Sequence, residues 1–194
     1  MLDEKSIKQA KYNAEQLIRE GKISKDSEGR YARFFLKNSQ DSFNTAKLLF
    51  LVSSDKNKKI ELGYPNFNGY LWVINSSYYS MFYMARALLE NSRIKIITDQ
   101  SIHSTVYFAL IYYFYLTGKI EKSLIEEFKN ANIDSTDILG KEKAKELMQD
   151  YHNEKEKRGR FTYEMGEIAM QNKAKTSLER AMNFNEKIRT MIRL

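Results

Sequence analysis

Residues 66–90 carry almost no charge, and this run constrains the fold more than any other part of the chain. It contains one cation, Arg86, and no acid before Glu90, whereas 29% of all residues are charged. As a helix it would be about 37 Å long, and a helix that is apolar or aromatic nearly all round is surrounded by other helices. A membrane span would have to place three asparagines, three serines and an arginine in lipid, which is costly. We therefore predict the central helix of a soluble domain.

The composition favours helices and excludes several kinds of metal site. One proline and eight glycines in 194 residues are few for a sheet-rich domain, which needs many turns. The lack of cysteine excludes disulfides, iron–sulfur clusters and thiolate zinc sites, and it suits a reducing cytoplasm. The first residues are charged and lack the apolar core of an export signal. We expect a cytoplasmic protein without cofactor or metal and without a membrane partner.

Apolar residues recur at helical spacing along most of the chain and predict an all-α fold, an up-and-down bundle of four or five helices. A short amphipathic helix over residues 3–20, closed by Gly21, is expected to lie outside this bundle. Residues 1–29 then form an extra N-terminal helix and linker, and residues 30–194 form the bundle. Further helices are expected over residues 30–52, 66–90, 101–116, 121–132 and 141–157, and from residue 166 onward.

Two stretches are expected to interrupt these helices. Residues 53–65 should form a lysine-rich loop, with Pro65 in the first turn of the central helix. Residues 158–163 read RGRFTY, and their glycine and β-favouring residues predict a turn before the last helix.

The chain is basic, with a formal charge of +7 and a sequence pI of about 9.3. Such a balance favours partners that carry phosphate, such as nucleotides or nucleic acid. An AT-rich genome also enriches lysine without any such function, so the charge alone leaves both interpretations open.

Polar and aromatic residues form a stripe along the central helix. Its members follow one another on one face at i, i+4, i+7 or i+8, and i+11: Asn75, Tyr79, Phe82 or Tyr83, and Arg86. An amide, phenols and a guanidinium on one face can bind a phosphate or a base. Alternatively, the tyrosines are core residues and Arg86 pairs with a nearby acid.

A second candidate site lies before the last helix. Four cations within six residues are followed by two aromatic residues: Lys155, Lys157, Arg158, Arg160, Phe161 and Tyr163. Such a segment can hold RNA phosphates and stack a base. Equally, it can be the basic end of a helix, which the helix dipole favours.

Three segments resemble the HEPN family, small all-α domains of bacteria and archaea. Residues 75–89, NSSYYSMFYMARALL, are similar to the second-helix pattern of that family. Residues 158–163 resemble the family's R-x-x-A-D-Y turn, with Arg158 and Tyr163 in place. Residues 37–50 look like the first bundle helix of the family.

The resemblance implies a module that binds a nucleotide or RNA and forms a homodimer. Active members are metal-independent ribonucleases with an R-x4-6-H motif, in which the histidine is the acid or base and the arginine stabilises phosphate charge. Here no histidine follows Arg158 at that spacing, and Tyr163 stands there instead. We therefore expect binding without catalysis, and the resemblance also implies a nucleotidyltransferase partner in a toxin–antitoxin-like pair. The expected binding residues are Asn75, Tyr79, Arg86, His103, Arg158 and Arg160.

Two other functions stay open at this point. A metal-independent ribonuclease could use Arg158 with Tyr163, or with His103 if the fold brings it close. A helical interaction scaffold would carry its basic charge without binding phosphate.

Overall fold

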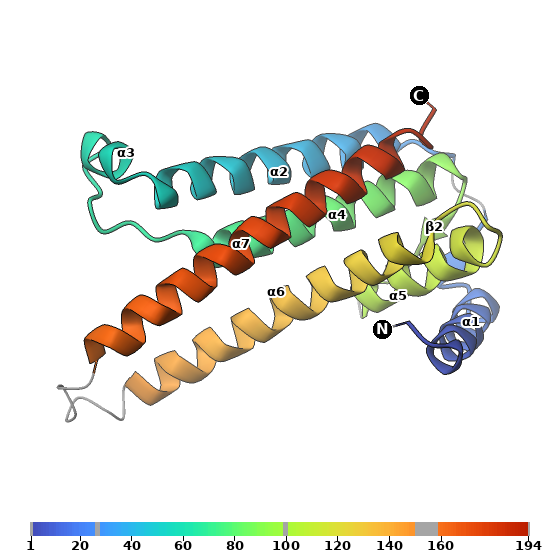
Figure 1. The fold of residues 1–194 in the computed structure, drawn as a ribbon. Coiled ribbons are helices and arrows are strands. Elements are labelled where there is room, and N and C mark those ends of the chain that lie inside the picture. Colours follow the sequence, from blue (N-terminus) through green and yellow to red (C-terminus); the bar gives the residue numbers. More distant parts are fainter. Residues whose placement is uncertain (1, 26–27, 99–100, 150–158, 194) are drawn as a thin grey trace.

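The computed structural model of the chain describes residues 2–25, 28–98, 101–149 and 159–193, with side chains except those of residues 138–139, 141–149 and 159–167. These residues form seven α-helices, one π-helical turn and two short strands (Figure 1). In chain order the elements are α1 Glu4–Arg19, β1 Ile23–Ser24, α2 Ala32–Ser54, α3 Lys56–Glu61, α4 Tyr70–Asn91, β2 Lys95–Ile96, α5 Ile102–Leu110, the π-helical turn η1 Ile111–Tyr115, α6 Lys122–Gln149 and α7 Gly159–Arg189. The prediction of an all-α helical bundle is confirmed.

Four long helices, α2, α4, α6 and α7, make up the bundle, and α4 lies at its centre. In Figure 1 α4 runs back along α2. α7 runs back beside α6 and crosses in front of α2 and α4. The contacts agree with this arrangement, since α4 packs against α2, α5, α6 and α7. At the edge of the bundle α1 contacts α5 and η1. An antiparallel pairing of β1 with β2 joins the segment after α1 to the loop after α4.

The buried position of α4 follows from its lack of charge. Fourteen of its 22 residues are buried, which leaves only one side partly exposed. That side comprises the exposed Trp72 and the partly exposed Leu71, Asn75, Ser76, Tyr79, Tyr83 and Arg86. Tyr83 stacks against Phe35 of α2. Tyr79 contacts the ring of His103 in α5, so this side of α4 lies between α2 and α5.

The first turn of α4 begins at Tyr70 and not, as expected, at residue 66. The Gly69 N–H donates to the Ser53 hydroxyl at 2.8 Å, and the Tyr70 hydroxyl donates to the Ser53 carbonyl oxygen at 3.1 Å. These bonds hold the start of α4 so close to the end of α2 that a Cβ on Gly69 would lie 3.1 Å from the Ser53 hydroxyl. Pro65 therefore precedes the helix and lies outside it.

The stretch between α2 and α4 contains a short helix, α3, where a loop was expected. Asp55 caps this helix by accepting hydrogen bonds from the backbone N–H groups of Asn57 and Lys58, at 2.9 and 3.1 Å. A cap of this kind satisfies N–H groups that the first turn of a helix leaves without partners. In Figure 1 α3 projects beyond the ends of α2 and α4.

A single helix, α6, replaces the two that were expected over residues 121–132 and 141–157. The residues between those two ranges, IDSTDILG, are weak helix formers. Tertiary contacts override this weakness. Asp134 binds Lys173 at 2.8 Å and Arg180 at 2.9 Å, both on α7, and these ion pairs hold the middle of α6 in place.

The last helix, α7, begins at Gly159 and not at residue 166. The turn expected over residues 158–163 is therefore wrong for residues 159–163, which form the first turns of α7. A glycine weakens a helix by only about 1 kcal/mol relative to alanine, which does not end a helix that continues along a bundle. Residue 158 lies outside the described residues.

The shorter helices agree better with the sequence. α1 follows an Asp3 cap and is closed by Gly21, which has a φ of 69°. The apolar segment expected over residues 101–116 belongs to the core, because Leu110, Ile111 and Phe114 are all buried. Within the described ranges, no helix has the length and the apolar character needed to cross a membrane.

Candidate functional site

A chain of hydrogen bonds joins three helices beside the middle of α4. The Tyr78 hydroxyl of α4 lies 2.6 Å from Nδ1 of His103 in α5, and Nδ2 of Asn132 in α6 donates to the same hydroxyl at 2.6 Å. Tyr78 is buried, whereas His103 and Asn132 are partly exposed. These three residues, which we call the Tyr78 cluster, therefore reach from the core to the surface.

The donors and acceptors of the Tyr78 cluster determine where the proton of His103 lies. The NH2 group of Asn132 can only donate, so the Tyr78 oxygen accepts this bond. We infer that the single hydrogen of the phenol points to its other partner, Nδ1 of His103. Because Nδ1 of His103 accepts, it carries no hydrogen, and we infer that the proton of the neutral ring is on Nε2.

Burial acts on both titratable members of the cluster. It raises the pKa of Tyr78 far above the usual value, although the hydrogen bond from Asn132 acts in the opposite direction. It lowers the pKa of His103. His103 is also the second residue of α5, and the positive end of a helix dipole disfavours a second positive charge. At neutral pH the cluster therefore holds a neutral imidazole and a protonated phenol.

Aromatic rings surround His103 and continue along the partly exposed side of α4. The His103 ring centre lies 4.5 Å from that of Phe82 and 5.9 Å from that of Tyr79. Tyr79 in turn lies 6.1 Å from Tyr83, which stacks on Phe35 at 6.3 Å. Tyr79 and Tyr83 are partly exposed, so this row offers flat surfaces on which a base can stack.

Asn75 forms a second polar link between α4 and α6, one turn before Tyr79. Its side-chain oxygen accepts a hydrogen bond from the buried Ser135 hydroxyl at 2.8 Å. This bond fixes the orientation of the amide and leaves its NH2 group as the donor for another partner. Asn75 is itself partly exposed, so a ligand beside Tyr79 can reach it.

Arg86 lies two turns beyond Tyr79 and packs against α2. Its guanidinium carbon is 4.4 Å from the centre of the Phe35 ring. Burial lowers the pKa of Arg86, while the negative charge of Glu90, one turn further on, acts in the opposite direction. The guanidinium thus contacts an aromatic ring of α2 and faces an acid of its own helix.

Two of the expected binding residues, Tyr79 and His103, are in contact in the structure. Asn75 lies one turn before Tyr79 on α4 and is also partly exposed. Arg86 lies apart from them at the boundary of α4 with α2.

The basic segment before the last helix is not placed relative to this region. Arg158 lies outside the described residues, and Arg160 and Tyr163 are described only as backbone in the first turns of α7.

The sequence interpretation missed Tyr78, Asn132 and Ser135. Tyr78 stands in an apolar run, and nothing in that run tells that its hydroxyl has partners. For α6 a signal does exist, because Asn132 and Ser135 continue the inward line of Ile125 and Phe128 at helical spacing. Polar residues on the buried side of a helix require hydrogen-bond partners.

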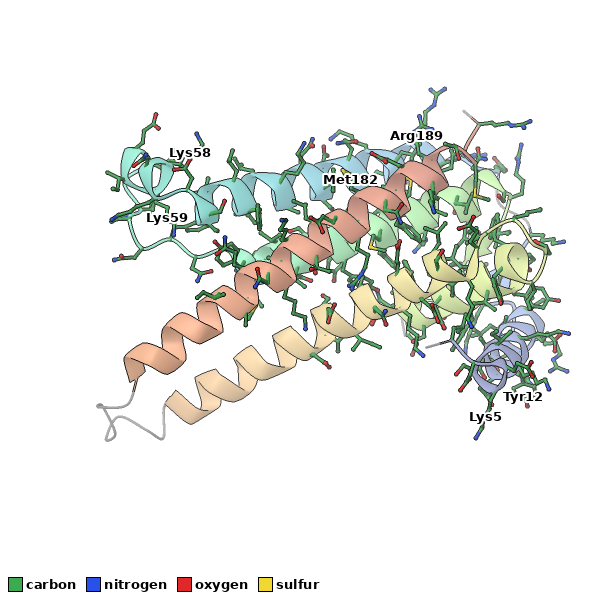
Figure 2. All side chains as sticks on the ribbon, in the orientation of Figure 1. Lys5, Tyr12, Lys58, Lys59, Met182 and Arg189 are labelled. Carbon is green, nitrogen blue, oxygen red and sulfur yellow. The ribbon has the colours of Figure 1, made fainter. Side chains whose placement is uncertain are left out.

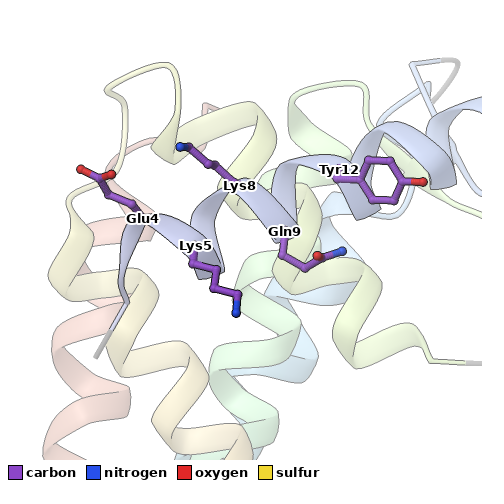
Figure 3. A pocket seen from close by; sticks show the side chains of 5 residues that line it. All are labelled: Glu4, Lys5, Lys8, Gln9 and Tyr12. Carbon is purple, nitrogen blue, oxygen red and sulfur yellow. The ribbon is translucent and has the colours of Figure 1, made fainter.

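A shallow depression on α1 is a weaker candidate. Five side chains line it: Glu4, Lys5, Lys8, Gln9 and Tyr12. Figure 3 shows that all five come from this single helix. One side of one helix cannot enclose a ligand, so this depression carries no site.

Neither a metal cluster nor a related protein identifies the site. In the part of the chain that the structure describes, no three His, Cys, Asp or Glu side chains lie close enough together to hold a metal ion. The chain matches no family model, no curated protein and no solved structure.

Proposed function

We propose that this chain is a HEPN-like helical module that binds a nucleotide or RNA around His103 and does not cleave it. The observation that carries the proposal is the 2.6 Å contact between the Tyr78 hydroxyl and Nδ1 of His103. This contact favours a neutral His103 that donates from Nε2 at the start of α5. A hydrogen-bond donor beside a helix N-terminus suits a phosphate oxygen.

The surroundings of His103 supply further contacts for such a ligand. Ser101 precedes α5 with a φ of 57°, and its side chain makes no capping bond to the first turn. The backbone N–H groups of that turn can therefore also donate to a phosphate. A base would stack on Tyr79, and the NH2 group of Asn75 would donate to its edge.

The same hydrogen bonds argue against cleavage of RNA. A general base for the 2′-hydroxyl needs a bare lone pair within reach of the substrate near neutral pH. The bare nitrogen of His103 is engaged by Tyr78, and burial raises the pKa of Tyr78 itself. Tyr163 stands where the family motif has a histidine. An unperturbed tyrosine has a pKa of about 10, which makes it a poor base near neutral pH.

We further propose that the module forms a homodimer through the partly exposed side of α4 and the adjoining part of α2, with the ligand at Tyr79 held between the two copies. Trp72 on α4 is 54% exposed and Phe34 on α2 is 57% exposed, and aromatic side chains are enriched in interfaces. The side of α4 from Trp72 to Arg86 carries one cation and no acid. Two copies of a chain with a charge of +7 repel each other least where such a surface is shared.

A nucleotidyltransferase is the proposed protein partner of this dimer.

Fluorescence anisotropy with labelled single-stranded RNA in the presence of a chelator tests the binding site. We expect Tyr79→Ala to weaken binding by about 5- to 150-fold, because one base-stacking contact contributes about 1–3 kcal/mol. His103→Ala should also weaken binding, while Tyr12→Ala, which removes an exposed tyrosine from α1, should bind like the wild type. Equal affinities of all these proteins would refute the site.

The integrity of the same RNA distinguishes binding from catalysis. We expect the RNA to stay intact, and we expect Arg158→Ala and Arg160→Ala to weaken binding because each removes a cation. Cleavage that disappears in Arg158→Ala would instead support a ribonuclease. If neither RNA nor any nucleotide binds or raises the melting temperature, the chain is a helical scaffold.

A further inference from the structure

We propose that the end of the molecule formed by α3 and the turn after it contacts the surface of an anionic lipid bilayer. This segment, residues 56–64, is called the α3 tip below. It projects beyond the ends of α2 and α4, and no residue of α3 is buried (Figure 1). The tip thus adds nothing to the core of the bundle. The proposal goes beyond the proposed function and does not depend on it.

Three large apolar side chains of the α3 tip are exposed to water. Ile60 is 57% exposed, Leu62 is 55% exposed and Tyr64 is 68% exposed. Several large apolar side chains gathered at one projecting place mark a surface that a partner covers, because their exposure to water is unfavourable.

The backbone holds these side chains outward in a fixed turn. Gly63 has a φ of 79°, which a residue with a side chain rarely adopts. Its N–H donates to the Ile60 carbonyl oxygen at 3.0 Å, and the Tyr64 N–H donates to the Lys59 carbonyl oxygen at 2.8 Å. The exposed apolar residues therefore belong to an ordered knob on the molecule.

Lysines accompany the apolar side chains of the tip. Lys56, Lys58 and Lys59 stand against a single acid, Glu61, within residues 56–64. Among the ion pairs of the described residues, none involves these three lysines. Figure 2 shows Lys58 and Lys59 at this end of the molecule, far from Lys5 of α1. The tip therefore combines an apolar knob with an excess of ammonium groups that can meet negative charge.

Shape and chemistry favour a bilayer over other anionic partners. A projecting knob needs a partner that yields around it, and a bilayer does so, whereas a protein would need a matching pocket. Of the three exposed apolar side chains only Tyr64 offers a flat ring on which a base could stack, which disfavours single-stranded nucleic acid. Tyrosine is enriched at the interface between membrane and water, and lysine ammonium groups reach lipid phosphates from there.

A surface contact of this kind needs no membrane-spanning helix. The expectation that the protein has no membrane partner rested on the lack of a spanning segment and of an export signal. Neither is required for a few side chains to enter the headgroup region.

Co-sedimentation of the full chain with lipid vesicles tests the proposal. We expect it to sediment with vesicles of phosphatidylcholine mixed with phosphatidylserine at low salt, and much less with phosphatidylcholine alone. Lys58→Gln with Lys59→Gln should weaken binding by about 25-fold, since each lysine near an anionic surface contributes a factor of about five. The matched control, Lys5→Gln with Lys8→Gln on α1, should bind like the wild type.

A fluorescent variant tests whether the apolar knob enters the lipid. Trp72 is the only tryptophan, so Tyr64→Trp combined with Trp72→Phe places a single reporter on the α3 tip. We expect its emission to shift to shorter wavelength when anionic vesicles are added. Leu62→Ser should weaken vesicle binding by roughly tenfold. Because no substituted residue of the tip is buried, circular dichroism should show unchanged melting for every tip variant.

Several outcomes would overturn the proposal. These are equal binding to both vesicle types, an equal loss in the α1 control, or no emission shift from the tip. A loss of RNA binding in the lysine variants with vesicle binding retained would assign the tip to nucleic acid. His103→Ala should leave vesicle binding unchanged, so failure at the Tyr78 cluster and failure at the tip are distinguishable.

Discussion

Ser39 of α2 and Ser80 of α4 bind each other's backbone reciprocally. The Ser39 hydroxyl donates to the Ser80 carbonyl oxygen at 2.8 Å, and the Ser80 hydroxyl donates to the Ser39 carbonyl oxygen at 2.8 Å. Asn185 of α7 donates to the Ser80 hydroxyl at 2.6 Å. Three helices therefore meet where small side chains allow their backbones to approach. This contact holds α4 against α2 and α7. On another side of α4, Tyr78 points toward α5 and α6.

Replacement of Ser80 by alanine should destabilise the bundle. Ser80→Ala removes the donor to the Ser39 carbonyl and leaves the partly buried amide of Asn185 without its acceptor. We expect a loss of about 1–3 kcal/mol in the free energy of unfolding, measured by urea denaturation. Ser54→Ala is the matched control, because the Ser54 hydroxyl is exposed and bonds only within its own helix, to Phe50 and Leu51. Equal losses in the two variants would contradict this account of the helix contact.

The ion pairs of Asp134 should make stability depend on acid pH. Burial alone would raise the pKa of Asp134, but hydrogen bonds and charges from Lys173 and Arg180 outweigh burial and hold this pKa below its usual value. A carboxylate with a lowered pKa stabilises the folded state at higher pH and loses this contribution as pH falls through its folded pKa. Relative to Asp134→Asn, the wild type should therefore lose stability from about pH 5 downward. Parallel pH profiles of the two proteins, measured by thermal unfolding, would contradict this.

His103 should give a second pH dependence, because the folded state favours its neutral form, whereas it favours the charged form of Asp134. The pKa of His103 is lowered in the folded state, so the unfolded chain binds the proton more readily and protonation favours unfolding. The free energy of unfolding should therefore fall as pH drops below about 6.5, the usual pKa of histidine. His103→Gln should remove this slope, whereas His152→Gln, which changes the only other histidine, should retain it. The reverse pattern would show that His103 is not the group responsible.

The proton of His103 should lie on Nε2 in the wild type. Nitrogen NMR of the histidine rings distinguishes the two tautomers and should show Nδ1 without a hydrogen. Tyr78→Phe removes the hydroxyl that joins His103 to Asn132, so the ring should become a mixture of tautomers. The same variant should lose about 1–3 kcal/mol of stability, because two polar groups lose their partner. A mixture already present in the wild type would contradict the hydrogen-bond chain.

Two glycine-to-alanine substitutions should act in opposite directions. Gly140 lies within α6, and a Cβ there meets no atom within 4 Å, so Gly140→Ala should stabilise the protein by about 0.5–1 kcal/mol. A Cβ on Gly69 would lie 3.0 Å from the Phe67 ring and 3.1 Å from the Ser53 hydroxyl. Gly69→Ala should therefore cost about 1–3 kcal/mol. Destabilisation by Gly140→Ala in urea denaturation would argue against a continuous α6.

The parts of the fold that were predicted correctly depend on local patterns. The charge-free run identified α4 because an uncharged helix of this length has to be surrounded, and Gly21 marked the end of α1 because glycine readily adopts a positive φ. The joined helix α6 was missed because weak local propensity around Asp134 is offset by ion pairs with residues of α7. Those partners are distant in the sequence, so no local pattern reveals them.

The sequence by itself determined that this chain is a helical bundle around one uncharged helix, and it singled out Asn75, Tyr79 and His103 as candidates. Only the tertiary structure decided which polar groups meet. Tyr78 bonds to residues 25 and 54 positions away, and Asn75 bonds to a residue 60 positions away. Helical periodicity tells which side of a helix faces inward, but the partner of a hydroxyl depends on how separate helices pack. For this reason the sequence predicts which residues form the core, while the packing of α4, α5 and α6 determines which nitrogen of His103 carries the proton.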